Sequence, residues 1–469
     1  MVNDWPADFQ PDVVRDAFGG KLTSYVIALE AWRRGLSVTF LSADISRYRI
    51  TDGAGRSVRF IRSRPNLTTL QAVRTANDKS LTNEALRAAG IPAPRSVRVD
   101  LASATPATLM HQADSLGYPV VLKPTNGSMG QGVFANIRTP EQLCRRFEDL
   151  RSTVKTTDAV LETHIAGEDH RVLVVGDRYV AACRRIPANV TGDGRSTVSE
   201  LIRRKNAARR RNPFLSKGLI RVDDEVRDFL ESQGLETDSV PAHGARIQLR
   251  SAANASAGGD VVDVTESLPQ EIREAAVAAV AAFPGLHTAG VDVLIDHDEA
   301  HSTTSYAVLE LNAHPQIGVN MYPTEGRGAD VPRHILDVHF PDSQRGGRQE
   351  DAEICFPLSA IQPALSSGVS DAVTLAPLPH HGFPVRQVHV GPGSTSLTRG
   401  QLIQVQRAAR EAGVAGSLRQ EDQEITLRLA GEAAGVETVL ARAEAVLSTC
   451  FDRHRPWVGP VRVGFVTGG

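Results

Sequence analysis

The chain has 469 residues and a formal net charge of −2 at pH 7, with 41% hydrophobic and 23% charged residues. This composition is typical of a soluble globular protein of about two to four domains. The balanced charge does not indicate a nucleic-acid or membrane partner, and we find no basic-then-apolar leader and no apolar run of membrane-spanning length.

The first 75 residues indicate a short α/β module. Residues 24–33 have the pattern of a helix, Gly35 stops it, and 36–41 have the pattern of a strand. A further helix is expected to begin at Asn77-Asp78-Lys79 and to end at Gly90.

The middle of the chain alternates buried strands with glycine-rich turns. The strand 118–123 leads into the loop NGSMGQG and the strand 133–137, and residues 160–186 indicate two strands around AGEDHR with a turn at 176–177. The turn TGDGRS precedes a basic helix. Its charged run, Arg203, Arg204, Lys205, Arg209, Arg210 and Arg211, indicates a solvated helix face, with contact to a phosphate or acidic substrate as the alternative.

Two later strands carry candidate metal ligands. An Ala-rich helix at 270–282 leads to the strand GVDVLID with Asp292, and the strand in VLELNAHPQIG carries Glu310 and Asn312. Residues i and i+2 of a strand share a face, so Glu310 and Asn312 project together and Asp292 can meet them from a neighbouring strand. Two carboxylates and an amide oxygen suit Mg²⁺, although exposed polar residues at a strand end would give the same pattern.

Lysines and glycines nearby suggest a phosphate site. Lys123 ends a buried strand just before a loop with Gly127, Gly130 and Gly132, whose backbone N–H groups can lie over phosphates. The spacing matches neither the Walker loop nor the Rossmann fingerprint, and a hairpin turn is the alternative. Lys79, in the first turn of its helix, is a further candidate for this site. The alternative is an ordinary lysine exposed to solvent.

Other polar side chains can complete a nucleotide site. Glu162 and Asp169 flank a hinge and can accept from ribose hydroxyls, while Arg171 and Arg184 can reach a phosphate or form surface salt bridges. Arg250 and Asn254 precede Gly258-Gly259, where a guanidinium can stabilise charge on a transferring phosphoryl group or a tetrahedral carbon.

The end of the chain indicates a linker and a small domain. Residues 342–384 are polar or rich in Pro, Ser and Gly. From 385 to 469 the pattern is β-α-β-β-α-β, with VRQVHV as the first strand and VRVGFV as the closing strand, which predicts a ferredoxin-like fold.

Taken in order, these segments resemble the ATP-grasp superfamily of carboxylate–amine ligases. The match covers about residues 76–341 and is most similar to the ATP-grasp region of cyanophycin synthetase and to the glutathione synthetase half of bifunctional glutathione enzymes. It is carried by DKSLTNEALRAAGIPAP, GYPVVLKPTNGSMGQGV, VLETHIAGEDHRVLVVGDRYVAACRRIPANVTGDG, LRSAANASAGGDVVDVT, AGVDVLI and LELNAHPQIGVNMYPTEGRGADVPRHILDVHFP. The resemblance implies an α/β (α+β) chain with an ATP-grasp fold.

The resemblance also implies a reaction and a site. ATP would phosphorylate a carboxylate and an amine would displace phosphate to give an amide, with two Mg²⁺ ions, or Mn²⁺, as cofactors. Lys79 and Lys123 would contact ATP, and the lid loop would contain Gly127, Ser128, Met129, Gly130 and Gly132. The adenine would meet Glu162, Thr163, His164 and Ile165, and the ribose would meet Asp169. The metal ligands would be Asp292, Glu310 and Asn312. The catalytic residues would be Arg250, Arg171, Arg184 and Asn254.

The chain departs from the family pattern at three places that bear on its predicted function. No Mur-ligase-like half follows residue 341, and Gly290 stands where D-alanine–D-alanine ligase has an arginine, a role that Arg250 is expected to take over. The tail from 385 to 469 resembles acylphosphatase without an evident catalytic arginine or asparagine, which suggests a structural or gating module. Two alternatives remain: phosphoryl transfer to a non-carboxylate, or a non-catalytic nucleotide-binding scaffold.

The remaining expectations concern partners and location. The partners would be small molecules, namely an amino acid or peptide acid and an amine. Similar enzymes are often homodimers, but the oligomeric state is left open. The four cysteines have no CxxC spacing, which predicts neither zinc nor disulfides and fits a reducing cytoplasm.

Overall fold

The structure is a computed structural model that describes residues 4–126, 132–153, 157–298, 303–346, 352–378, 382–393 and 396–468. The chain forms two units. The first comprises Met1–Pro6 and Val58–His339, and the second comprises Ala7–Ser57 and Phe340–Gly469. No helix among the described residues is both long enough and apolar enough to cross a membrane.

The first unit contains a four-stranded antiparallel sheet in the order β5-β8-β6-β7. Its strands are β5 (Ser96–Asp100), β8 (Asp158–Thr163), β6 (Val120–Pro124) and β7 (Phe134–Ile137). Helices α5 (Pro106–Leu116) and α6 (Pro140–Thr153) pack on it around a core that includes Leu109, Phe147 and Leu161. Pro106 lies in the first turn of α5, where its missing N–H costs no hydrogen bond.

A second sheet in this unit has the order β13-β10-β9-β14-β15. Its strands are β13 (Asp260–Asp263), β10 (Arg178–Ile186), β9 (Glu168–Val175), β14 (Thr288–Asp298) and β15 (Thr303–Asn312). Helices α3 (Leu70–Asn77), α4 (Lys79–Ala88) and α9 (Gln270–Ala281) share its hydrophobic core. Val172, Val291 and Val293 point into that core, so alternation sends the residues between them to the other face.

The segment 160–186 differs from the two strands expected from the sequence. It contains three strands, because β8 ends at Thr163 and belongs to the first sheet, whereas β9 and β10 belong to the second. The residues around AGEDHR therefore form a hinge between two sheets and not a hairpin within one. The sequence could not show this, because strand pairing depends on distant partners.

Residues 188–250 add a smaller subdomain with its own core, which includes Val190, Val198 and Val226. It contains β11 (Asn189–Thr191), α7 (Val198–Arg211), α8 (Asp224–Glu231) and β12 (Arg246–Gln248). Thr197 and Glu200 form a capping box at the start of α7, so the helix begins where the turn TGDGRS ends. Beyond β15 the unit ends with α10 (Gly318–Met321) and α11 (Val331–His339).

The second unit begins with α2 (Leu22–Arg33), β1 (Ser37–Phe40) and β2 (Arg47–Thr51), which confirms the helix and strand expected near the N-terminus. The segment expected to be a linker contributes short elements to this unit. Strand β17 (Val373–Thr374) pairs antiparallel with β1, and β16 (Ile354–Cys355) pairs parallel with β22 (Val461–Arg462).

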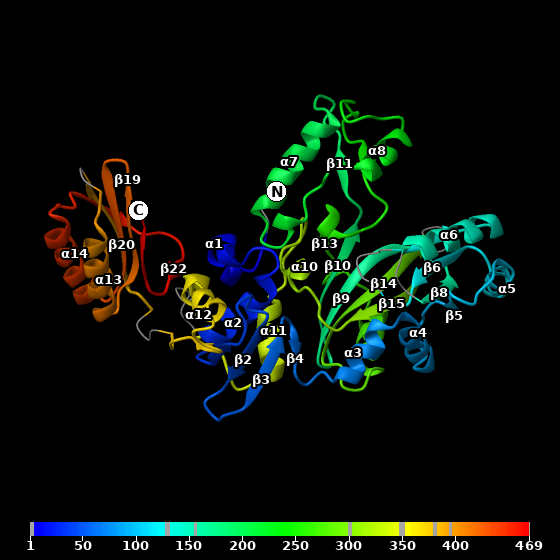
Figure 1. The fold of residues 1–469 in the computed structure, drawn as a ribbon, viewed down its shortest axis with the longest axis horizontal. Coiled ribbons are helices and arrows are strands. Elements are labelled where there is room, and N and C mark those ends of the chain that lie inside the picture. The colour runs from blue at the N-terminus through cyan, green and yellow to red at the C-terminus, as the bar shows by residue number, and fades with distance from the viewer. Residues whose placement is uncertain are drawn as a thin grey trace. The chain divides into compact units, whose positions relative to one another are not determined.

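The C-terminal part of this unit is a sheet in the order β21-β18-β20-β19-β23 with two helices (Figure 1). The elements are β18 (Val385–Pro392), α13 (Arg399–Glu411), β19 (Ala415–Glu421), β20 (Glu424–Gly431), α14 (Ala433–Leu447), β21 (Arg453–Pro456) and β23 (Phe465–Gly468). Both helices pack with Leu418 and Leu427 in one core.

The closing strand of this β-α-β-β-α-β pattern is β21, and the expectation that VRVGFV closes it is wrong. Strand β21 pairs with β18, whereas the end of the chain adds β23 along β19 at the opposite edge. The sequence pattern misses this strand because its four residues, RHRP, are all exposed at a sheet edge and show no apolar alternation. The acylphosphatase resemblance of this part stays a prediction.

Candidate active site

The strands β14 and β15 place two carboxyl groups side by side. Asp292 lies directly opposite Glu310 in the antiparallel register, and Gly290 lies opposite Asn312. Because Val291 and Val293 point into the core, Asp292 projects from the face that the core leaves free. The pairing expected from sequence alternation is therefore present in the structure.

Two arginines from neighbouring strands hold Asp292. Arg171 of β9 is its direct cross-strand partner and donates Nε to Oδ1 and Nη2 to Oδ2, the second at 3.1 Å. Arg185 of β10 places Nη2 3.1 Å from the same Oδ2. Burial acts to raise the pKa of Asp292, but the two guanidinium groups outweigh it and hold the pKa below its usual range. Asp292 is therefore a carboxylate with a defined orientation.

Gly290 makes the Arg171 contact sterically allowed. A Cβ atom at position 290 would lie 2.9 Å from both Cδ and Nη1 of Arg171. The guanidinium thus occupies the space beside Asp292 that a side chain at 290 would fill. Arg250, which we expected to compensate for the glycine, instead donates to Asp223, Glu225 and the carbonyl oxygen of Arg221.

Glu310 faces a lysine. Lys79, at the start of α4, has its Nζ atom 3.9 Å from Oε2 of Glu310, and Asn312 Nδ2 donates to Oε1 at 3.4 Å. Burial and the nearby Asp292 carboxylate raise the pKa of Glu310, against the opposing charge of Lys79. The pKa values of the two facing carboxyls therefore shift in opposite directions.

This donor set fits a hard divalent cation. Asp292, Glu310 and Asn312 offer carboxylate and amide oxygens on one face, and a cation between the carboxyls would relieve their repulsion. Among the described residues no group of three or more His, Cys, Asp or Glu side chains could hold a metal ion by itself. The candidate site thus depends on the amide and on ligands from outside the protein.

The second candidate lysine is held in a buried ion pair. Lys123 of β6 places Nζ 2.5 Å from Oε1 of Glu162 at the end of β8. Asn83 of α4 donates to the other carboxylate oxygen at 3.3 Å, while its own Oδ1 is buried without a hydrogen-bond partner among the described residues. Burial lowers the pKa of Lys79, and the charge of Lys123 adds to this effect. The charges of Lys79 and Lys123 therefore interact.

The hinge after β8 approaches β14 closely. Gly167 has a φ of 132°, and a Cβ atom there would lie 2.7 Å from the backbone of Ile295. His164 donates its backbone N–H to Pro119 at 3.0 Å, and Thr163 donates its own to Arg95 at 2.9 Å. Ile165 lies in the same hinge. The backbone contacts of this hinge hold the residues that are expected to meet adenine.

Arg185 is a member of this site that the sequence did not single out. Its Nε donates to Oδ1 of Asp169 at 2.9 Å, so it joins Asp169 to Asp292. Burial raises the pKa of Asp169, against the charge of Arg185. Arg184, a catalytic residue predicted from the sequence, lies on the opposite face and pairs with Glu168 at 2.6 Å. Both arginines are half-buried and burial along β10 does not alternate, so only their partners distinguish them.

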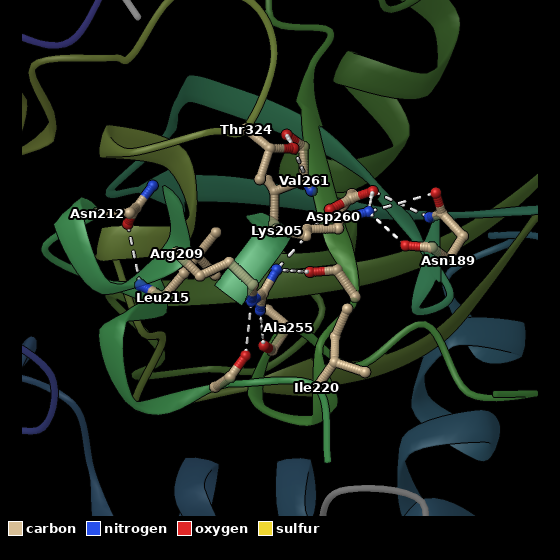
Figure 2. Close-up of polar contacts among 12 residues, drawn as sticks. Asn189, Lys205, Arg209, Asn212, Leu215, Ile220, Ala255, Asp260, Val261 and Thr324 are labelled. Atoms are coloured by element: carbon tan, nitrogen blue, oxygen red, sulfur yellow. Dashed lines mark hydrogen bonds and ion pairs between the residues drawn. The ribbon is translucent and has the colours of Figure 1, made fainter. Parts of the chain in front are cut away.

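The loop that carries Asn254 is anchored by a buried arginine (Figure 2). Arg209 of α7 is 3% exposed and donates to three carbonyl oxygens, those of Gly218 at 2.7 Å, Ala255 at 2.7 Å and Gly259 at 2.9 Å. A Cβ atom at position 218 would lie 2.4 Å from the carbonyl oxygen of Ala255. The loop after Asn254 is thus packed closely against residues 218–220.

A lysine one turn earlier on α7 extends this network. Lys205 donates to Oδ2 of Asp260 at 2.6 Å and to the carbonyl oxygen of Asn189 at 2.7 Å (Figure 2). The solvated-face interpretation of the basic helix is therefore wrong for Lys205 and Arg209. The other charged residues of the run are exposed, namely Arg203, Arg204, Arg210 and Arg211.

Part of the expected lid loop lies outside the described residues, namely Gly127, Ser128, Met129 and Gly130. Gly132 is described, with a φ of 68°, two residues before β7. A positive φ at this position favours glycine, because other residues strain there.

Comparison with known proteins identifies the domain. Residues 76–201 match the RimK-like ATP-grasp domain. Cyanophycin synthetase from Trichormus variabilis is 33% identical over 340 residues, which cover 71% of this chain and 36% of that protein. The glutathione biosynthesis bifunctional protein GshAB from Desulfotalea psychrophila is 28% identical over 338 residues, which cover 70% of this chain and 42% of that protein.

A solved structure has the same fold. The bifunctional glutathione synthetase from Pasteurella multocida superposes with a TM-score of 0.54 at 23% identity, covering 70% of this chain and 44% of that one. The chain thus spans only 36% to 42% of the length of the two curated relatives described above. The comparisons assign an ATP-grasp domain and an ATP-grasp fold to this chain.

Proposed function

We propose, from the premise that this chain carries a RimK-like ATP-grasp domain, that it is an ATP-dependent amide ligase. The reaction would activate an amino acid or peptide carboxylate as an acyl phosphate and join it to an amine. The observation that carries this proposal is the pairing of Asp292 with Glu310 beside Lys79. These groups combine a place for divalent cations with a positive charge for phosphate.

Asp292, Glu310 and Asn312 would hold two Mg²⁺ ions, with Mn²⁺ as a substitute. Such ions complete their coordination with phosphate oxygens and neutralise charge on a transferring phosphoryl group. Arg171 and Arg185 keep Asp292 ionised and oriented for this role. Support for the ion sites comes from the donor set and from the facing positions of Asp292 and Glu310.

The nucleotide would lie along the hinge. Lys79 and Lys123 would direct charge at the phosphates, and the loop from Gly127 to Gly132 would cover them. Glu162, Thr163, His164 and Ile165 would meet adenine. Asp169 would accept from ribose, a role in which it would exchange or share its contact with Arg185. Such charge-assisted contacts are short and orient their partners.

The chemistry would proceed in two steps. A substrate carboxylate oxygen attacks the γ-phosphorus of ATP, and the bond from that phosphorus to the ADP oxygen breaks. The amine nitrogen then attacks the acyl carbon, loses a proton and expels phosphate. Arg171, Arg250 and Asn254 are our candidates for stabilising the charge that develops on oxygen, and Arg184 is left out because it pairs with Glu168 on the opposite face of the sheet.

The decisive experiment measures ADP release with single acids, single amines and their pairs, followed by mass spectrometry of the product. An amide ligase releases ADP only when both substrates are present. Glu310→Gln should abolish this release, whereas Glu271→Gln, an exposed change on α9, should leave it unchanged.

Other outcomes lead to other functions. A phosphorylated product formed without an amine would indicate phosphoryl transfer to a non-carboxylate, and ATP binding without any turnover over the panel would indicate a scaffold. Turnover retained in Glu310→Gln would contradict the metal site. A cytoplasmic location is part of the proposal, whereas the oligomeric state stays open. All four cysteines are free thiols, as a reducing compartment would keep them.

A further inference from the structure

The sheet of the C-terminal part has one face covered by helices and one that bears arginines. Leu418 and Leu427 are cross-strand partners and point into the core with α13 and α14. Their neighbours in sequence therefore point to the opposite face. Arg419 and Arg428 are among these neighbours, and both are exposed. The arginines thus belong to the face away from the helices.

The strand register places three arginines together on this face. Arg428 of β20 and Arg455 of β21 are both direct partners of Val388, on either side of β18. Arg419 of β19 is the partner of Thr426, two residues from Arg428 along β20. Neighbouring strands lie about 4.8 Å apart, so the three side chains extend over one patch. We call Arg419, Arg428 and Arg455 the arginine patch.

The patch lacks internal neutralisation. Among the described residues, no carboxylate lies within salt-bridge distance of any of its three guanidinium groups. The arginines beside it are paired, since Arg453 binds Glu424 at 2.6 Å and Arg386 binds Glu353 at 2.5 Å. Arg419 and Arg428 are diagonal neighbours on adjacent strands, where their like charges repel unless an anion compensates them.

We propose that the arginine patch is a docking surface for an acidic segment of a polypeptide in extended conformation. Side chains at i and i+2 of an extended segment project the same way about 6.8 Å apart, a spacing that the long arginine side chains can match with carboxylates. The hydroxyl groups of Ser417 and Thr426 lie on the same face and offer additional donors.

The composition of the face favours a peptide over a nucleic acid. The side chains that lie between the arginines in the cross-strand rows are Val388, Val390, Ser417 and Thr426. None of these has an aromatic ring, and sheet faces that bind single-stranded nucleic acid use such rings to stack bases. Trp457 lies two residues beyond Arg455 and outside these rows, so the rows themselves offer guanidinium groups without a stacking platform and match carboxylates better. This docking surface goes beyond the proposed ligase reaction and needs neither ATP nor a metal ion.

The test measures binding of fluorescent poly-L-glutamate to the full chain by anisotropy at several salt concentrations, with ATP absent. The test variant replaces Arg419, Arg428 and Arg455 by Gln. The control variant replaces Arg407, Arg410 and Arg442 by Gln; these three are exposed on α13 and α14, so the net charge changes by the same amount. Circular dichroism establishes that both variants fold.

We expect wild type and control to bind poly-L-glutamate with an affinity that falls as salt rises, and the patch variant to bind roughly tenfold more weakly or worse. Equal loss in both variants would show a non-specific charge effect and overturn the proposal. Tighter binding of polyuridylate RNA, or of vesicles containing phosphatidylserine, would replace the peptide by another partner. Absence of any binding would also overturn it. Because no arm uses turnover, failure here leaves the ligase proposal untouched.

Discussion

Arg184 and Arg185 are adjacent in the sequence, but their guanidinium groups lie on opposite faces of one sheet. Arg185 joins Asp169 and Asp292, whereas Arg184 pairs with the more exposed Glu168. Consecutive residues of a strand alternate between faces, so one position decides whether an arginine belongs to the site. This relationship provides a matched pair of variants.

Replacing Arg185 by Met should lower kcat/KM on the order of 100-fold, because Asp292 loses one of its two cationic partners and Asp169 loses its orientation. Arg184→Met should change it only a few-fold, since that ion pair is partly exposed and lies outside the site. The measurement is steady-state ADP release with the acid and amine found by product analysis. Equal losses in the two variants would contradict the placement of Arg185 in the site.

Replacing Gly290 by Ala should lower kcat roughly tenfold or more. The added methyl group would lie 2.9 Å from Arg171, which must then leave Asp292. The control is Gly400→Ala on α13. A Cβ atom added there would meet no other part of the protein within 4 Å, so a slight stabilisation is expected. Thermal unfolding separates lost activity from lost fold. If Gly290→Ala turns over normally, the contact between Arg171 and Asp292 is not needed for the reaction.

Replacing Arg209 by Gln should reduce the free energy of unfolding by about 2–4 kcal/mol, because three buried carbonyl oxygens lose their donors. Arg210→Gln, at an exposed neighbouring position, should change it by about 0.5 kcal/mol or less. Urea unfolding followed by circular dichroism measures both. A small effect at Arg209 would mean that the loop after Asn254 is held by other contacts.

Stability should fall with acid through His339. Burial, together with the nearby His287, lowers the pKa of His339 to about 4, and its Nε2 is buried without a hydrogen-bond partner among the described residues. The unfolded chain takes up this proton near pH 6.5, so the folded form loses stability as pH falls from about 6.5 to about 4. The loss from this group can reach about 3 kcal/mol.

A His339→Gln variant should show a shallower dependence of unfolding free energy on pH between 7 and 5 than the wild type. His111→Gln, an exposed change on α5, should leave the wild-type slope in place. Urea titrations at several pH values measure these slopes. An unchanged slope in His339→Gln would assign the acid sensitivity to other groups.

Local patterns in the sequence were sufficient for most elements of the ATP-grasp region. The helix at Lys79, the strand at Lys123 and the strands of Asp292 and Glu310 all follow from apolar spacing and turn residues, and the structure has them. The two-residue period of a strand also set which polar residues share a face. Motif order then implied the domain family, which the matched residues 76–201 bear out.

Only the tertiary structure decided which distant groups meet. It placed Arg171 and Arg185 on Asp292, turned Lys205 and Arg209 inward, and made β21 the strand that completes the C-terminal sheet order. The physical reason is that a side chain's face is set by its own backbone within a few residues. The partner of that side chain, in contrast, is set by strand register and by packing between segments far apart in the chain. The local sequence around a charged residue is the same whether its side chain contacts water or a carboxylate.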